Sequence, residues 1–429
     1  MNLERGELAA NRIQVKMTTQ KTETYSTIIV GAGIVGSAFA AFLSEEKFAG
    51  RVLLLDRSFE EVVGSTGYAP GFLGQFNESN VLTRLAVNSL KEYERFPGVF
   101  KRVGGLELAR TEQGVRQLNE RCKKANASGL EARILTEKEA ASVIPTFVSD
   151  GSYDAALHFP TDGVADPHAL CLAYRDLACR NGVETLETNV ESFEIADGAI
   201  SGVRTADGKI LHAERVIVAT GIWTRLLAKS ATSLPVPVVP VAHPYVYTAE
   251  RAAETQTAFC RWPEDHVYAR FHGRRFGLGS YDHAPVHVEH PAATATEPWP
   301  STTFGSVIAK AARTKVASDA ELANLASLDS DDHSNSFKLI NGVFSVTPDN
   351  LPLLGPVPGV EGLWLAAAIW VTHAAGSARL LLQMLQGESY DADMAHALDP
   401  ARFRDEDVQE LHETALKQYN DIYRSEVAR

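Results

Sequence analysis

The sequence has few cysteines, no excess of basic residues and no long hydrophobic run. Its four cysteines form no C-x-x-C pair, so we expect neither a disulfide framework nor a thiolate metal site, which fits a reduced setting. The net charge of -13 argues against a nucleic-acid surface, which needs clustered Lys and Arg. The most apolar run, residues 362–371, is shorter than the roughly 18 residues of a membrane span. Small molecules remain as the expected partners.

The length and the first residues of the chain set the frame for its domains. At ~100 to 200 residues per domain, a chain of 429 residues should build two or three cores. Residues 1–24 mix acidic and basic side chains, whereas a secretory signal needs an apolar core and a transit peptide avoids acids. We expect a flexible N-terminal tail over 1–24 and a cytoplasmic location, with an organelle as the alternative.

The clearest local pattern lies in residues 26–56. A β-rich run, TIIV, precedes the glycines Gly31, Gly33 and Gly36 in G-x-G-x-x-G spacing, and a helix-competent stretch of small residues follows. Asp56 ends the next apolar run, 20 residues after Gly36, where a carboxylate can accept hydrogen bonds from an adenosine ribose. The pattern predicts a βαβ unit that binds a dinucleotide, NAD or FAD, at the helix N-terminus.

The remaining chain indicates further strands and helices. We expect a helix over 166–182, hairpin turns at the two ADG triplets (196–198 and 206–208), and a buried strand in RVIVATG (215–221). The proline-rich stretch 233–248 suits sheet edges and connections and indicates a domain boundary. Helices are expected over 305–327 and 404–424, and a strand followed by a helix over 362–387.

Ten stretches of the sequence, in their order and spacing, resemble the D-amino-acid oxidase superfamily of flavoproteins, and within it the sarcosine and dimethylglycine dehydrogenase branch. They are GAGIVGSAFA, GSTGYAPGFLGQ, GGLELARTEQG, LTEKEAASVIP, DGVADPHAL, RVIVATGIWT, VPVAHPYVYT, GLGSYD, TPDNLPLLGP and HAAGSARLLLQMLQGE. The resemblance covers residues 25–390 and favours FAD over NAD, because one FAD domain is then assembled from distant segments.

The resemblance implies an α/β (α+β) fold class, with a discontinuous Rossmann-like FAD-binding domain and a substrate domain on a mixed or antiparallel sheet. The expected FAD-binding segments are 25–100, 149–235 and 341–390, and the expected substrate segments are 101–148 and 236–340. Residues 391–429 are expected to form a helical extension, too short for a further domain.

The residues expected to bind FAD come from several separate parts of the chain. Ser65 and Thr66 offer hydroxyls, Gly64 and Gly71 permit a tight path, and the resemblance implies the others. The full set is Gly31, Gly33, Ile34, Val35, Gly36, Asp56, Arg57, Gly64, Ser65, Thr66, Tyr68, Ala69, Gly71, Val190, Ala219, Thr220, Gly221, Trp223, Asp349, Ala368, Ile369, Trp370 and His373. Ala368 stands where many relatives have glycine.

The candidates for substrate contact and catalysis are Tyr245, Tyr268, Arg270, Tyr281, Trp370 and His373. An arginine can clamp a carboxylate, and an aromatic face can hold an amine or its methyl groups, although a surface arginine is the commoner case. No metal is expected, because prolines interrupt the spacing of His283, His287 and His290.

The family chemistry implied is hydride transfer to the flavin N5 from the carbon next to nitrogen of a secondary or tertiary, N-methylated amine or amino acid. The resulting imine would hydrolyse to an amine and an aldehyde. Deamination of a primary amine, as in D-amino-acid or glycine oxidases, is the alternative, and a nicotinamide dehydrogenase or a flavoprotein without turnover are the others. Oxygen, a quinone or an electron-transfer flavoprotein could accept the electrons.

Tyr68 marks a departure from the branch. Where the branch has Gly-Ser-Thr-Trp-His, with the histidine joined to the flavin 8α carbon, this chain has Gly67 and Tyr68. The superfamily's alternative cysteine anchor falls on Gly342. Either the Tyr68 phenol forms the link, or FAD is held without a covalent bond. We favour non-covalent binding, because a phenol with a pKa of roughly 10 is a weak nucleophile at neutral pH.

Overall fold

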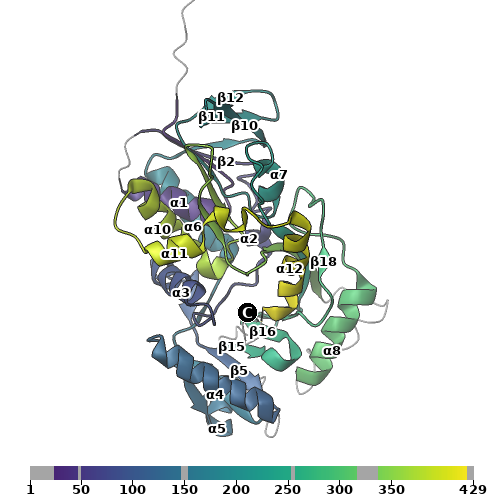
Figure 1. Ribbon diagram of the computed structural model, residues 1–429. Helices are drawn as coiled ribbons and strands as arrows, with labels where there is room; N and C mark the ends of the chain where they lie inside the picture. The colour runs from purple at the N-terminus through teal and green to yellow at the C-terminus, as the bar shows by residue number, and fades with distance from the viewer. Residues whose placement is uncertain (1–23, 47–49, 146–152, 253–256, 316–336, 423–429) are drawn as a thin grey trace, which may run out of the picture.

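A computed structural model of the chain describes residues 24–46, 50–145, 153–252, 257–315 and 337–422 (Figure 1). Residues 1–23 of the expected N-terminal tail, and residues 316–327 of the helix expected over 305–327, lie outside the described residues.

A six-stranded sheet forms the first layer of the molecule. Five of its strands are parallel and the edge strand β20 is antiparallel. In sheet order the strands are β20 (Leu353–Pro356), β21 (Leu363–Ala367), β13 (Val216–Val218), β1 (Thr27–Val30), β2 (Val52–Asp56) and β9 (Glu184–Glu187). Segments far apart in the sequence therefore meet in one sheet, as the expected discontinuous domain requires.

Alternating residues of these strands pack into two cores. Ile29, Leu54 and Ile217 face the helices α1 (Ile34–Glu45), α3 (Asn80–Tyr93), α6 (Pro167–Arg180) and α10 (Ala374–Gln386). The neighbouring Ile28 and Leu53 face the three-stranded sheet of β10 (Val190–Ala196), β11 (Ala199–Thr205) and β12 (Ile210–His212). The sheet is thus covered on both sides, which explains its continuous apolar strands (Figure 1).

The local predictions for this layer are confirmed. The hairpin turns between β10, β11 and β12 contain Gly198 and Gly208, with φ of +79° and +81°. Asp166 caps α6 by accepting the Ala169 N–H at 3.0 Å, with Pro167 in the first turn.

A second, nine-stranded sheet lies beside the first layer. Its order is β18 (Val286–His287), β14 (Val239–Tyr247), β17 (Arg275–Ser280), β16 (Val267–His272), β15 (Phe259–Trp262), β5 (Gly105–Ala109), β7 (Ala155–Phe159) and β6 (Arg133–Leu135). The ninth strand, β19 (Lys338–Val346), pairs with the other side of β14. One face of this sheet packs on α5 (Glu137–Val143) and α8 (Ser306–Lys315).

The expectation that the prolines of 233–248 lie at an edge is wrong for β14, which has neighbours on both sides. The Pro240 carbonyl accepts from Val288 N–H at 3.0 Å, on the β17 and β18 side. Strand alternation turns Pro244 to the same side, where the neighbour changes from β18 to β17. Neither missing N–H therefore interrupts the β19 ladder.

Strand pairing differs from the expected domain segments at two places. β7 and the last part of β19 were expected in the FAD-binding segments, but both belong to the nine-stranded sheet. A small sheet of β3 (Phe72–Leu73), β8 (Gly163–Ala165) and β4 (Phe100–Arg102) joins the two layers. Within the described residues, the other α-helices are α2 (Ser65–Tyr68), α4 (Glu112–Ala127), α7 (Thr224–Ala228), α11 (Ala392–Ala397) and α12 (Val408–Asp421).

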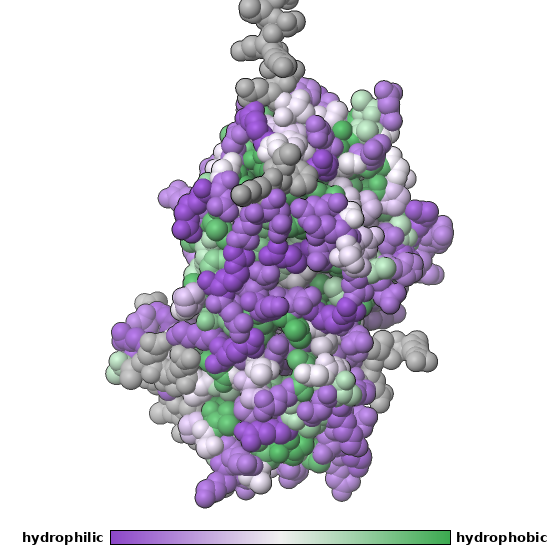
Figure 2. All heavy atoms as spheres, turned by 90° about the vertical axis from the view of Figure 1, so that its left-hand side faces the viewer, coloured by the Kyte–Doolittle hydropathy of each residue, from purple (hydrophilic) through white to green (hydrophobic). Residues whose placement is uncertain are grey.

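The surface over α1, α3 and α10 is mainly hydrophilic. Figure 2 shows polar side chains over most of this face, with hydrophobic ones in smaller groups between them. Arg379 of α10 pairs with Glu92 of α3 at 2.9 Å, and Arg95 pairs with Glu45 of α1, so ion pairs link the three helices. No helix within the described residues is long and apolar enough to cross a membrane.

Candidate cofactor and substrate cavity

The turn between β1 and α1 and the first turn of α1 each have a glycine with no room for a side chain. Gly31 has a φ of +103°, and a Cβ there would lie 2.4 Å from the Ala219 carbonyl oxygen. A Cβ on Gly36 would lie 1.9 Å from the Gly31 carbonyl oxygen. Asp56, at the end of β2, accepts the Ala32 N–H at 2.6 Å. The turn therefore brings bare backbone and the N-terminus of α1 to the cavity wall, as phosphate binding requires.

A buried arginine that sequence reasoning missed supports the same turn. Arg175 of α6 donates from Nε and Nη2 to the Ala32 carbonyl oxygen, at 2.8 and 2.6 Å, and lines the cavity. Its guanidinium places a positive charge behind a turn suited to phosphate groups. In the sequence Arg175 is one residue of an ordinary helix, and only the packing of α6 against α1 brings it to the turn.

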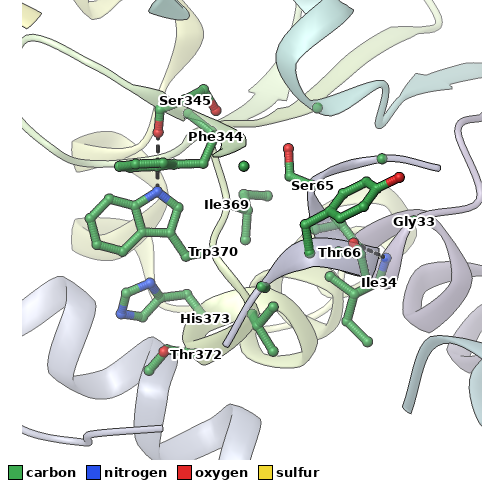
Figure 3. A pocket seen from close by; sticks show the side chains of 18 of the residues that line it. Gly33, Ile34, Ser65, Thr66, Phe344, Ser345, Ile369, Trp370, Thr372 and His373 are labelled. Atoms are coloured by element: carbon green, nitrogen blue, oxygen red, sulfur yellow. Dashed lines mark hydrogen bonds between the residues drawn. The ribbon is translucent and has the colours of Figure 1, made fainter. Parts of the chain in front are cut away.

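Hydrogen bonds link the segment 64–71 to both α1 and β19. Thr66 Oγ1 accepts the Ile34 N–H at 3.1 Å, and the Ser65 hydroxyl donates to the Val343 carbonyl at 2.7 Å. Figure 3 shows Ser65 and Thr66 on one side of the cavity and Phe344, Trp370 and His373 on the other. The two hydroxyl groups thus hold the segment 64–71 between α1 and β19.

Arg270 does not take the position expected of a substrate clamp. Its Nη1 donates to the carbonyl oxygens of Gly71 and Ala165, at 2.6 and 3.1 Å, and it is not among the residues that line the cavity. Arg270 lies two residues beyond Tyr268 on β16, where the 64–71 segment and β8 cover it. Its guanidinium therefore holds the end of that segment from behind.

The C-terminal wall is built at the start of α10. The Trp370 indole donates to the Ser345 carbonyl at 3.1 Å, as Figure 3 shows. Burial lowers the pKa of His373 to about 4, so its imidazole is neutral at neutral pH. Ala368 has a φ of +54°, in the left-handed region that favours glycine. The backbone thus keeps the geometry of a glycine position although the residue is alanine.

Three other expected cofactor residues, Asp349, Arg57 and Trp223, have protein partners. The Asp349 carboxylate accepts from Arg402 Nε and Nη2 at 2.9 and 3.1 Å. At the opposite end, the Arg57 guanidinium lies 4.1 Å from the centre of the Trp223 ring, whose indole donates to the Ala292 carbonyl at 3.1 Å. Both pairs shape the cavity wall.

One row of residues crosses the cavity-facing side of the nine-stranded sheet. Tyr245 pairs with Gly279, Gly279 with Tyr268, Tyr268 with Arg261, and Arg261 with Glu107. A Cβ on Gly279 would lie 2.4 Å from Tyr268 Cζ and 2.8 Å from Tyr245 Cδ2. The glycine therefore lets the two tyrosine rings lie nearly parallel, 5.7 Å apart.

Each tyrosine of the row bonds to a histidine. Tyr268 OH lies 2.6 Å from His243 Nε2, and Tyr245 OH lies 2.8 Å from His272 Nε2. Burial holds the pKa of both histidines well below its usual range, so both imidazoles are neutral. His243 also lines the cavity.

The charged end of the row contains residues that sequence reasoning missed. Arg121 donates to both oxygens of Glu107, at 2.9 and 3.1 Å, and to Glu78 at 3.0 Å. Arg261 Nη1 lies farther from Glu107, at 3.8 Å. Arg121 and Arg261 both line the cavity, so this end of the row brings two guanidinium groups to the cavity wall. No sequence signal distinguishes Arg261 from other arginines.

The cavity has a volume of about 600 Å³ and runs from Asp56 past the glycine turn to Arg261. It is lined by every expected cofactor and substrate residue except Gly36 and Arg270. Gly36 lies behind Gly31, and its lack of a side chain leaves room for the Gly31 carbonyl oxygen. A bare-backbone turn, a carboxylate after β2 and a long continuous cavity fit FAD, which would lie along these walls with its phosphates at the turn.

Fold and site together define a dinucleotide-binding protein of the flavoprotein type, with a second sheet over one end of the cavity. A profile of the FAD dependent oxidoreductase (DAO) family matches residues 26–384. The chain belongs to this family of FAD dependent oxidoreductases.

Individual relatives agree with this assignment. The chain is 26% identical to mitochondrial dimethylglycine dehydrogenase of Rattus norvegicus over 390 residues, which cover 88% of this chain and 44% of the relative. It is 28% identical to 4-methylaminobutanoate oxidase (formaldehyde-forming) of Paenarthrobacter nicotinovorans over 352 residues, which cover 80% of this chain and 41% of the relative. The chain therefore spans less than half the length of these two relatives.

Among solved structures, L-proline dehydrogenase from P. horikoshii superposes with a TM-score of 0.77 at 21% identity. The match covers 89% of this chain and 98% of that one. This likeness confirms the predicted fold class.

We expect acid precipitation of the holoprotein to release free yellow FAD. A Cβ on Gly342 would lie 3.7 Å from Tyr68 Cβ, so the two positions of the alternative covalent anchors are neighbours in this cavity. Neither carries the histidine or cysteine of the relatives, and a phenol is the weaker nucleophile. Flavin that stays on the wild-type pellet, but is released from Tyr68→Phe, would instead establish a phenolic link.

Proposed function

We propose that this protein oxidises the C–N bond of an N-methylated amino acid, a secondary or tertiary amine. Water would hydrolyse the resulting imine to an amine and formaldehyde. The row Tyr245, Tyr268 and Arg261 carries this proposal, because it combines two aromatic rings with one arginine at the cavity. The names of the two relatives, dimethylglycine dehydrogenase and 4-methylaminobutanoate oxidase (formaldehyde-forming), support the same substrate class.

The two tyrosine rings suit the nitrogen end of such a substrate. Tyr245 is 2% exposed and Tyr268 4%, and a third ring, Tyr281, has its centre 5.6 Å from that of Tyr268. Aromatic faces attract ammonium groups and pack on N-methyl groups. Rings held by cross-strand packing and by the Tyr–His bonds would keep the amine in one orientation.

Arg261 suits the carboxylate end. It is the cross-strand neighbour of Tyr268, with its side chain 18% exposed, and its guanidinium lies over the Phe259 ring at 5.0 Å. A guanidinium can bind a carboxylate through two parallel N–H bonds. We propose Arg261 in the role that the sequence suggested for Arg270.

FAD, when bound, supplies the two-electron oxidation. The residues of the chain bind the carboxylate, orient the amine between the rings and exclude water. No strong base is needed, but the amine must be neutral, since its lone pair drives the C–H bond to break. We therefore expect flavin reduction to rise with pH through an amine or active-site ionisation.

Anaerobic mixing of the holoprotein with candidate amines tests the proposal. We expect N-methylated amino acids to bleach the visible flavin band and to give formaldehyde at one equivalent per flavin. Release of ammonia from a primary amino acid, without formaldehyde, would favour the oxidative deamination alternative. A flavin that no amine bleaches would refute both, and readmission of air would show whether oxygen accepts the electrons.

A further inference from the structure

A continuous line of hydrogen-bonded rings leads from the cavity to the outer side of the nine-stranded sheet. Tyr268 OH lies 2.6 Å from His243 Nε2, and His243 Nδ1 lies 2.7 Å from Tyr419 OH. Tyr419 OH in turn lies 2.7 Å from His283 Nε2. His283 Nδ1 lies 2.8 Å from the carbonyl oxygen of Ala284, which is exposed. Four titratable side chains thus connect a buried site with the surface.

One arrangement of protons satisfies every bond in this line. If His243 and His283 carry hydrogen on Nδ1, then Tyr268 donates to His243, His243 to Tyr419, Tyr419 to His283, and His283 to the Ala284 carbonyl. All donors then point away from the cavity. Both histidines are neutral in this arrangement, in agreement with the lowering of their pKa values by burial.

The C-terminal helix supplies the central member of the line. Tyr419 of α12 is fully buried and packs with Val239 and Val241 of β14 and Val346 of β19. Figure 1 shows α12, in yellow, alongside β18, and the rings of His412 and His287 are 4.5 Å apart. Gln418 and Ile422 of the same helix line the cavity. Without α12, His243 would have no connection to His283.

The outer end of the line can accept a proton. Burial lowers the pKa of His283, and the bond to the Ala284 carbonyl and the nearby Asp282 carboxylate offset part of this lowering. Asp282 also pairs with Lys310 of α8. The other titratable groups facing this end are Tyr281, 5.2 Å from Tyr419 between ring centres, and His243, 6.3 Å from His283. A protonated His283 therefore has a carboxylate beside it. Within the described residues, the rings packed near His243 are those of Tyr268, Tyr281, Tyr419, Phe344 and His283.

We propose that Tyr268, His243, Tyr419 and His283 form a proton outlet that removes the ammonium proton of the bound substrate. The substrate N–H bond breaks as its proton passes to Tyr268, whose own proton passes to His243 Nε2. The Nδ1 proton of His243 passes to Tyr419, and the Tyr419 proton ends on His283, which releases it to water. The amine keeps its lone pair. After the product leaves, His283 takes a proton from water, the protons shift back along the line, and Tyr268 gives its proton to water in the emptied cavity, which restores the Nδ1–H tautomer of His243.

This inference rests on the proposed function, and rapid mixing of the holoprotein across a pH series tests both. In Tyr419→Phe we expect the pH midpoint of flavin reduction to rise by about one unit, a loss on the order of ten-fold below the midpoint, because the proton can no longer leave. His283→Gln, on a half-buried loop, should give the same shift, and the double variant no further shift. A role of Tyr419 in packing alone would change stability or KM but not the midpoint.

Tyr174→Phe is the matched control, since the Tyr174 hydroxyl is buried in α6 without a hydrogen bond to the described residues. Its pH midpoint should equal that of the wild type. A wild-type flavin that no amine bleaches overturns the proposed function and the outlet together. A wild type that bleaches, with both outlet variants at the wild-type midpoint, overturns the outlet alone.

Nitrogen-15 spectra of the histidines give a readout independent of turnover. We expect His243 and His283 in the Nδ1–H tautomer in the full-length holoprotein, assigned by comparison with His283→Gln. A His243 imidazole with hydrogen on Nε2 would overturn the proposal, because the donors would then point toward the cavity.

Discussion

Replacing Arg261 with methionine should lower kcat/KM for an N-methylated amino acid by on the order of 100-fold. A charge-assisted bond to a carboxylate in a partly buried site contributes about 2 to 3 kcal/mol, and every 1.4 kcal/mol corresponds to ten-fold. Methionine keeps the apolar contact with Phe259. Glu107 keeps its two bonds from Arg121, at 2.9 and 3.1 Å, so the substitution leaves no bare carboxylate behind.

The decarboxylated counterpart of the substrate is the control for this variant. An amine without a carboxylate gains nothing from Arg261, so the wild type and Arg261→Met should oxidise it with similar kcat/KM. Equal losses on both compounds would indicate that Arg261 supports the fold. No loss on either would remove it from the substrate site.

Substituting Gly36 with alanine should lower the stability of the folded protein even in the absence of FAD. The added Cβ would lie 1.9 Å from the Gly31 carbonyl oxygen, a backbone atom that cannot move without displacing the turn. Overpacking of this kind costs about 3 kcal/mol, which corresponds to a drop on the order of 5 to 10 °C in apparent Tm. The affinity for FAD should fall about 100-fold as the turn is displaced.

Gly33→Ala is the matched substitution within the same turn. Gly33 has a φ of -67°, which alanine adopts, and its Cβ would lie 3.3 Å from Thr66 Oγ1, a side-chain atom that can give way. The Tm of the apoprotein should therefore hardly change, while the methyl group narrows the path of the phosphates and weakens FAD binding about ten-fold. Thermal unfolding without FAD and fluorescence titration with FAD separate the two effects. Equal Tm values for both apoprotein variants would contradict the packing role of Gly36.

The N-terminal half of the site could be predicted because its signals are local. A strand, three glycines at fixed spacing and an acid after the next strand are read within 30 residues. In the structure these residues form a turn, which is held by the 2.6 Å hydrogen bond from the Ala32 N–H to the Asp56 carboxylate. The resemblance to relatives added the distant segments, whose residues line the same cavity.

The sequence could not predict which of two arginines, Arg261 or Arg270, lines the cavity. Arg261 and Arg270 lie on neighbouring strands of one sheet, and either could face a substrate. The pairing register puts Arg261 beside Tyr268 and Glu107, whereas Arg270 lies opposite Gly277 and under the 64–71 segment. Register arises from contacts between distant segments, and no pattern within either strand encodes it.

The C-terminal helix also has one feature that the sequence predicted and one that it could not predict. The sequence predicted a helix over 404–424, and α12 covers 408–421, because periodicity is a local property. Tyr419 joins the line between Tyr268 and His283 only because β14, β16, α12 and the loop that contains His283 meet at one point. The sequence by itself determined the cofactor class, the glycine turn and most of the helices and strands. Only the tertiary structure decided which polar side chains share the cavity, since burial, register and hydrogen-bond partners are set by residues far apart in the chain.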